Sequence, residues 1–246
     1  MNLRNFTSAI LSFIPFGMML RDYERLTDFL LFASGYITFV ILVSFFILRG
    51  GKRPRHDYLL LLGILLYLVG LFGALAAVSS LAIRLLLAAA ASVLLFFRIV
   101  SFSKTPVWNL NEWFTVGTGA LLLLGQWAWN FYFTPAWYLV LFAAASLFFL
   151  LFWQAGREQG LFPIRAVEGA LVGSLLMVEV TWSLLFWPTH FFTIAAVSFA
   201  PFYLIYVLSS LYFTKRLSKR QAYFQIGAVA AMVIIVMLSS PWQPIK

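Results

Sequence analysis

Glu179 is the acidic residue that lies deepest within an apolar stretch of this sequence, in the segment Met177-Val-Glu-Val-Thr-Trp. An ionisable side chain in such a stretch needs a partner, a water-filled cavity or a proton, because lipid does not solvate charge. Residues of this kind mark an ion pathway or a contact between helices. Glu179 is therefore the first residue whose type and position could carry chemistry.

Three further charged residues fall within apolar runs: Arg84, Arg98 and Glu168. Glu168 and Glu179 are 11 residues apart, which places them about 20° apart on one helical face. Arg84 and Arg98, 14 residues apart, lie about 40° apart by the same arithmetic. If the two helices are neighbours, the spacing predicts two ion pairs, Glu179 with Arg84 and Glu168 with Arg98.

Three roles for Glu179 are open at this point. The first is structural: Glu179 fixes the register of the bundle, either as a partner of Arg84 or as a protonated acid bonded to a neighbouring helix. The second is a proton or cation site in a transport path, and the third is a catalytic acid. The catalytic role would require a polar cluster that joins Glu179 to groups such as Gln126 or Asn130. We favour the structural role, since structural ion pairs place ionisable groups in apolar surroundings and so resemble active groups.

Two further features concern helix packing. Gly169 and Gly173 form a Gly-xxx-Gly pair, which predicts close helix contact, either as a dimerisation seam or within the monomer. Pro201 interrupts an apolar run near its middle and frees a backbone carbonyl. The proline indicates either a gate or a static kink.

The motifs of common enzyme and cofactor sites are absent from the sequence. It contains no Gly-x-Ser-x-Gly, no His-Glu-x-x-His and no glycine-rich phosphate loop followed by lysine. It has no cysteine, and its two histidines, His56 and His190, lie on opposite predicted sides of the membrane, which argues against a metal site. We expect no catalytic residue, no metal and no cofactor, and we favour a non-enzymatic role.

The composition identifies the solvent of this chain as a lipid bilayer. Hydrophobic residues make up 63% of the sequence and charged residues 10%, with a mean hydropathy of +0.95, whereas charged residues are about a quarter of a soluble protein. The apolar runs are continuous and lack the alternation of a β-barrel, so they predict helices. The predicted fold class is an all-α integral membrane protein.

Eight apolar runs are long enough to cross the membrane, and they predict a bundle of eight transmembrane helices in four antiparallel hairpins. They cover residues 26–48, 58–78, 81–100, 113–131, 136–153, 167–187, 191–213 and 222–238. We divide the chain into an N-terminal segment, 1–25, and a single polytopic transmembrane domain, 26–246. Within the first segment, residues 5–20 predict an interfacial or re-entrant helix, with a short ninth span as the alternative.

The basic residues predict the orientation. Of the 17 Lys and Arg residues, twelve fall on one set of alternate loops and five on the other, which places the first set in the cytoplasm and the C-terminus outside. The predicted location is the plasma (inner) membrane. The net charge of +9 then fits anionic lipid headgroups at the basic loops as partners, and we expect no nucleic acid.

The C-terminal third resembles a known class of protein. The segments that carry the resemblance are Val178-Glu-Val-Thr-Trp, Pro188-Thr-His-Phe-Phe-Thr and Ser239-Ser-Pro-Trp-Gln-Pro. They are similar to uncharacterised multi-pass membrane families of small-genome bacteria. The resemblance implies a bacterial plasma membrane and gives no residue a function, because these families have no assigned activity.

The sequence therefore predicts a polytopic inner-membrane protein without an identifiable reaction. Its favoured role is that of a structural or accessory subunit that contacts another membrane protein or a second copy of itself. The alternative is a small proton- or cation-coupled transporter or channel that uses Glu179.

Overall fold

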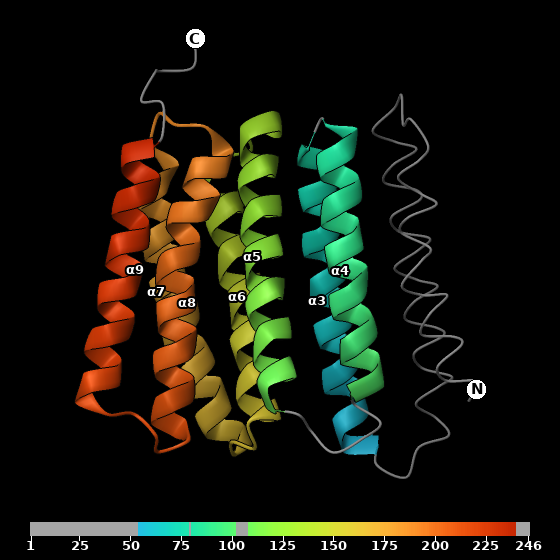
Figure 1. Cartoon of the computed structure of the whole chain (residues 1–246), viewed down its shortest axis with the longest axis vertical. Helices are drawn as coiled ribbons and strands as arrows, with labels where there is room; N and C mark the ends of the chain where they lie inside the picture. The colour runs from blue at the N-terminus through green and yellow to red at the C-terminus, as the bar shows by residue number, and fades with distance from the viewer. Residues whose placement is uncertain (1–53, 79, 102–107, 240–246) are drawn as a thin grey trace.

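The computed structural model describes residues 54–78, 80–101 and 108–239, and these residues are almost entirely helical. Within these ranges the helices lie side by side with short connections, and no strand is present (Figure 1). In chain order they are α3 (Pro54–Ala77), α4 (Leu81–Ser101), α5 (Trp108–Phe133), α6 (Trp137–Glu158), α7 (Pro163–Leu185), α8 (Phe191–Phe213) and α9 (Lys219–Ser239).

Four of these helices, α6 to α9, are long and apolar enough to cross a membrane. Two shorter apolar stretches, Leu61–Ala76 and Ala82–Leu95, lie within α3 and α4. The predicted helical class is therefore confirmed for the described residues, and the four apolar helices support a membrane location. The predicted span 26–48 and the interfacial segment 5–20 lie outside the described residues.

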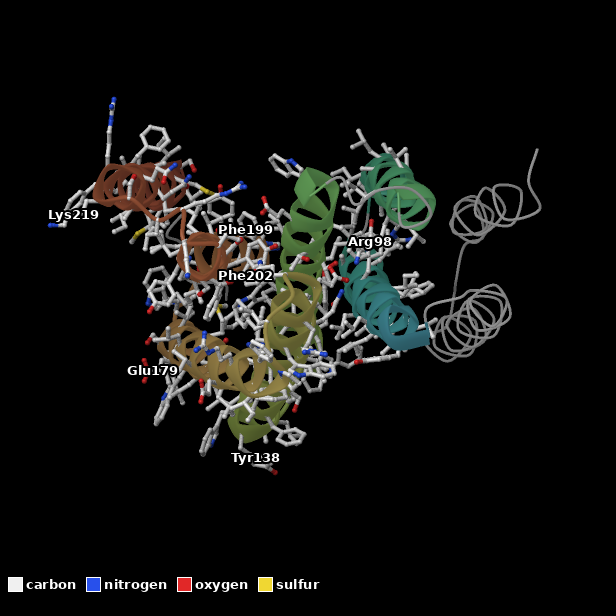
Figure 2. All side chains as sticks on the ribbon, turned by 90° about the horizontal axis from the view of Figure 1, so that it is seen from below. Arg98, Tyr138, Glu179, Phe199, Phe202 and Lys219 are labelled. Carbon is white, nitrogen blue, oxygen red and sulfur yellow. The ribbon has the colours of Figure 1, made fainter. Side chains whose placement is uncertain are left out.

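Helix α5 occupies the centre of the bundle and is more polar than its neighbours. It packs against α3, α4, α6 and α8, and Figure 2 shows it between the α3–α4 pair and α8. Its most extensive contact is with α3. Because α5 is covered on several sides, polar residues such as Thr115, Thr118 and Gln126 are buried in protein.

The α3–α5 contact depends on glycine. A Cβ atom added at Gly73 would lie 2.8 Å from the Cα of Gly125, and one at Gly70 would lie 2.7 Å from the backbone nitrogen of Leu122. Close approach of backbones replaces the hydrophobic effect as the associating force between helices in lipid. These glycines therefore allow a contact that a larger residue would push apart.

The second half of the chain forms a group of neighbouring helices. Helix α6 packs extensively on α7, α8 contacts α5 and α7, and α9 packs on α8 at the edge of the bundle. The indole Nε1 of Trp127 on α5 donates a hydrogen bond to Ser198 Oγ on α8, at 2.9 Å, and so joins the central helix to this group. No residue of α9 is fully buried.

The end of the bundle that contains the α6–α7 and α8–α9 connections, at the bottom of Figure 1, is called the basic end. The name refers to Arg157, Arg165 and the segment Lys215–Arg220, which lie at or beside these connections. The other end, formed by the α5–α6 and α7–α8 connections, is called the opposite end.

Candidate functional site

Glu179 lies on the outward side of α7. The side of this helix that faces the bundle is formed by small and apolar residues together with Thr181, and its buried members are Ala166, Ala170, Gly173, Ser174, Met177, Thr181 and Leu184. Glu179 is exposed, and Figure 2 shows its side chain directed away from the bundle. Within the described residues, its carboxyl group makes no hydrogen bond or ion pair. Only its backbone carbonyl accepts a bond, from Ser183 Oγ at 2.8 Å.

Arg84 has a different partner from the one that the sequence suggested. Its Nε donates a hydrogen bond to the backbone carbonyl of Val78, just beyond the end of α3. A cationic side chain at a helix C-terminus satisfies an orphan carbonyl and interacts favourably with the helix dipole. Arg84 therefore fastens the α3–α4 turn.

The pairing of Arg84 with Glu179 is not present because their helices are not neighbours. Helix α4 packs on α3 and α5, whereas α7 packs on α6 and α8. The central helix α5 therefore lies between the two groups (Figure 2). The proposed link from Glu179 to Gln126 is also not formed, since Gln126 is buried on α5 and Glu179 faces outward.

Arg98 is the most deeply buried cation in the described part of the chain. It is 2% exposed and forms an ion pair with Glu158 of α6. Its guanidinium carbon lies 5.2 Å from the ring centroid of Phe114, within the range of a cation–π contact. Its partner is thus Glu158 and not Glu168, which is exposed on α7.

Sequence reasoning missed Glu158 because it placed the end of the span at residue 153. The helix continues for more than one further turn, to Glu158. The signal was present in the spacing of Gln154 and Glu158, four residues apart on one helical face. Gln154 Nε2 donates a hydrogen bond to Glu158 Oε1 at 3.1 Å.

Arg98 of α4 and Gln154 and Glu158 of α6 form a polar group that connects these two helices near the basic end. Gln154 is 1% exposed, and its amide occupies the space left by the missing side chain of Gly63 on α3. Replacing Gly63 by a larger residue would displace this amide. The polar group therefore joins α4 to α6, and α3 packs against it at Gly63.

Tyr206 of α8 belongs to the same region. Its hydroxyl lies close to the side chains of Thr115 and Gln159, and it is in electrostatic range of Glu158. Beside it lies a cavity of about 30 Å³ between α6, α7 and α8, whose polar lining comes from Gln159, Tyr206, Ser209 and Ser210. This volume holds about two water molecules.

The remaining predicted features lie at helix contacts. A Cβ at Gly173 would lie 2.8 Å from the ring of Phe152 on α6, and one at Gly169 would lie 3.5 Å from the ring of Phe213 on α8. The Gly-xxx-Gly pair therefore packs inside the described chain. Pro201 is half-buried within α8, one turn from the Trp127–Ser198 hydrogen bond, and the helix continues through it.

A continuous exposed surface runs along α7, and we call it the α7 seam. Its residues follow one another at alternating spacings of three and four, and all of them are exposed: Arg165, Glu168, Val172, Leu175, Glu179, Trp182 and Phe186. Trp182 stacks on Trp137 of α6 with ring centroids 6.5 Å apart, which extends the surface toward α6 at the opposite end. Glu179 thus lies in a mostly apolar and aromatic surface.

The described residues contain no group of three or more His, Cys, Asp or Glu side chains that could hold a metal ion. The polar group at Arg98 contains one acid and one base already paired with each other. Such a pair is suited to holding helices in place. It does not combine a nucleophile with a general base, as a hydrolytic site would require.

The comparisons with known proteins agree with the resemblance seen in the sequence. No curated protein and no solved structure matches the chain. Residues 136–239, which comprise α6 to α9, match the family model described as protein of unknown function (DUF5656). The α7 seam and the cavity beside Tyr206 lie within or against this matched segment, which is similar to a family with no assigned activity.

Proposed function

We propose that this chain is a structural or accessory subunit of a membrane assembly and that it contacts its partner through the α7 seam. The observation that carries the proposal is the position of Glu179, an acid on the outward face of a membrane-length helix. Within the described residues its carboxyl group has no partner. A protein surface that covers the seam would supply one.

The depth of Glu179 makes lipid an unfavourable neighbour. Leu185, the last residue of α7, is six residues beyond Glu179, or about 9 Å along the axis at 1.5 Å per residue. A charged side chain at the centre of the hydrocarbon costs about 3 kcal/mol on insertion scales, and the cost falls toward the interface. Lipid tails offer no hydrogen bond to either form of the carboxyl group.

The residues around Glu179 support a protein contact. Trp182 and Trp137 stack on one another while both remain more than half exposed, at 55% and 59%. Aromatic side chains are enriched in protein–protein interfaces, and they bury a large area at little cost in conformational entropy. Trp residues also prefer the membrane interface, so the acid is what distinguishes this surface from an ordinary lipid-facing one.

The proposal includes the topology of the full chain. Eight spans in four hairpins would place the basic end in the cytoplasm, where Lys and Arg contact anionic headgroups of the plasma membrane. The concentration of basic residues at Arg157, Arg165 and Lys215–Arg220 supports this orientation. Reporter fusions to the α6–α7 and α7–α8 loops test it, and an external α6–α7 loop would contradict it.

A transport role through Glu179 receives less support from the geometry. A transport path would require water or polar groups that reach the carboxyl group from within the bundle. Glu179 faces outward, whereas the cavity beside Tyr206 lies near the basic end and is lined by other residues. Assembly explains an outward-facing acid more directly than conduction does.

The test compares the size of the native complex in three forms of the tagged full-length chain. Membranes that contain the wild type, Glu179→Leu or Tyr223→Leu are solubilised in a mild detergent and separated by native electrophoresis. Tyr223 is the matched control, because it is 75% exposed on α9 and lies outside the seam. We expect the wild type and the control to migrate as a larger assembly and Glu179→Leu to shift to a smaller species.

Two kinds of result would contradict this proposal. The first comes from the electrophoresis: either the wild-type chain migrates as a monomer under all mild conditions, or Glu179→Leu does not change the size of the complex. The other is proton or cation flux by the wild type in liposomes that Glu179→Gln abolishes without loss of folded protein. The second result would establish the transport alternative.

A further inference from the structure

The α7 seam has properties that specify one kind of partner. Because every copy of the chain is inserted in the same orientation, two copies can meet along α7 only with their helices parallel. A contact with two-fold symmetry brings each surface patch against itself or its neighbour on the other copy. Each residue of the seam must therefore pack or pair with the same residue, or its neighbour in the seam, on the second copy.

The spacing of the seam fits a parallel helix pair. Val172, Leu175, Glu179, Trp182 and Phe186 follow one another at intervals of three, four, three and four, which is the pattern of a left-handed coiled coil and of most membrane helix bundles. The four apolar members lie on either side of Glu179. Their exposed fractions are 61%, 61%, 55% and 74%. These residues form the apolar layers of the contact.

The charged residues at the basic end of the seam can pair between two copies of the chain. Arg165 and Glu168 occupy successive positions at the basic end, so in a parallel pair the guanidinium of each copy lies one layer from the carboxylate of the other and can reach it through its long side chain. Glu179 meets Glu179 of the second copy near the symmetry axis. A carboxylic acid can donate a hydrogen bond to a carboxylate, so two such groups satisfy one another when they share one proton.

We infer that the chain forms a parallel homodimer along the α7 seam, with the two Glu179 carboxyl groups bonded to each other across the two-fold axis. This inference rests on the proposed function and names its partner as a second copy of the chain. One contact then accounts for an acid that has no partner among the described residues, for the charged residues at the basic end and for the exposed apolar layers. The Gly169–Gly173 pair takes no part, since Gly169 packs against Phe213 of α8 and Gly173 against Phe152 of α6.

The absence of cysteine from the sequence makes a direct test available. Leu175→Cys and Ile235→Cys each introduce a single thiol, the first in the seam and the second on α9, where Ile235 is similarly exposed at 66%. The purified full chain is reconstituted at high lipid-to-protein ratio and oxidised. We expect disulfide-linked dimers from Leu175→Cys and at least fivefold less from Ile235→Cys.

Substitutions of Glu179 test the contact between the carboxyl groups. Glu179→Leu should weaken self-association by roughly tenfold, as expected from the loss of one interhelical polar contact in a membrane, while Glu179→Gln should retain it through its amide. Glu179→Lys alone should dissociate, because two like charges then face each other. A mixture of Glu179→Lys and wild type should form hetero-dimers, detected by two different tags.

The outcomes separate this inference from the proposal on which it rests. Equal cross-linking at both thiols, or a Glu179→Lys chain that dimerises as well alone as with the wild type, would overturn the homodimer. If Leu175→Cys forms cross-links to another polypeptide in native membranes while the purified chain stays monomeric, the homodimer is wrong and the subunit role stands. If Leu175→Cys forms no cross-link in either setting, both proposals fail.

Discussion

Loss of Glu158 should destabilise this protein more than loss of any exposed acid, because it would leave the buried guanidinium of Arg98 without its carboxylate. Arg98 is 2% exposed, and the Glu158 side chain is 12% exposed, so the pair is largely removed from solvent. Breaking a buried pair by removing one partner costs about 3–5 kcal/mol. Since Glu158 retains slight exposure, we expect about 3 kcal/mol for Glu158→Leu.

A loss of about 3 kcal/mol lowers the folding equilibrium constant by about two orders of magnitude. The double variant Arg98→Met with Glu158→Leu should recover most of this loss, because replacing both members of a buried pair by apolar residues is often neutral or stabilising. The free energy of unfolding can be measured by steric trapping in bicelles. The four proteins of the double-mutant cycle then give the coupling energy directly.

The control is Glu112→Leu, which removes an exposed acid from α5, outside the α7 seam, and should change the stability by less than about 0.5 kcal/mol. The reasoning is refuted if Glu158→Leu is as mild as this control. It is also refuted if the double variant is as unstable as the sum of the two single variants, since the two residues would then act independently.

Three further predictions concern helix contacts and one turn, and each is checked by thermal unfolding in detergent. Gly73→Ala should cost about 2 kcal/mol because its methyl group would meet the α5 backbone at 2.8 Å, whereas Gly227→Ala on α9, with nothing within 4 Å, should be neutral or stabilising. An equal response at the two glycines would contradict the close α3–α5 contact. Trp127→Phe should cost about 1 kcal/mol through loss of its 2.9 Å hydrogen bond to Ser198, and Ser198→Ala should add nothing further in the double variant. Gly160→Ala should cost about 1 kcal/mol, because its φ of +80° disfavours a side chain, and a stabilised variant would show that this turn rearranges freely.

The helices of this protein could be predicted well from the sequence because a bilayer requires long, continuously apolar segments whose backbone hydrogen bonds are satisfied internally. The predicted run 191–213 coincides with α8, and the other described helices differ from their predicted runs mainly at the ends. Helix α6 continues five residues past the predicted end at 153, and α5 begins five residues before 113. Hydropathy marks only the apolar part of a helix, whereas backbone hydrogen bonding continues into the interface.

The partners of the charged residues could not be predicted in the same way. Helical arithmetic places Glu168 and Glu179 on one face of α7 correctly, and both are exposed there. It does not say which helices are neighbours, and the position of α5 between α4 and α7 separates Arg84 from Glu179. Neighbour choice depends on where backbones approach closely, as at Gly73, and a single sequence does not rank such contacts.

The central position of α5 also sets an order for biogenesis. Helix α3 forms its most extensive contact with α5 and not with α4, its neighbour in the chain, so the synthesis of α3 is complete before its main partner has been made. At 5–20 residues per second, synthesis of the chain between the end of α3 and the end of α5 takes roughly 3–10 s. During this interval α3 is held against α4 by contacts such as the hydrogen bond that the Tyr67 hydroxyl donates to the Ala91 carbonyl, while its glycine face awaits α5. A nascent chain arrested before residue 133 should therefore expose that face to the insertion machinery and its chaperones.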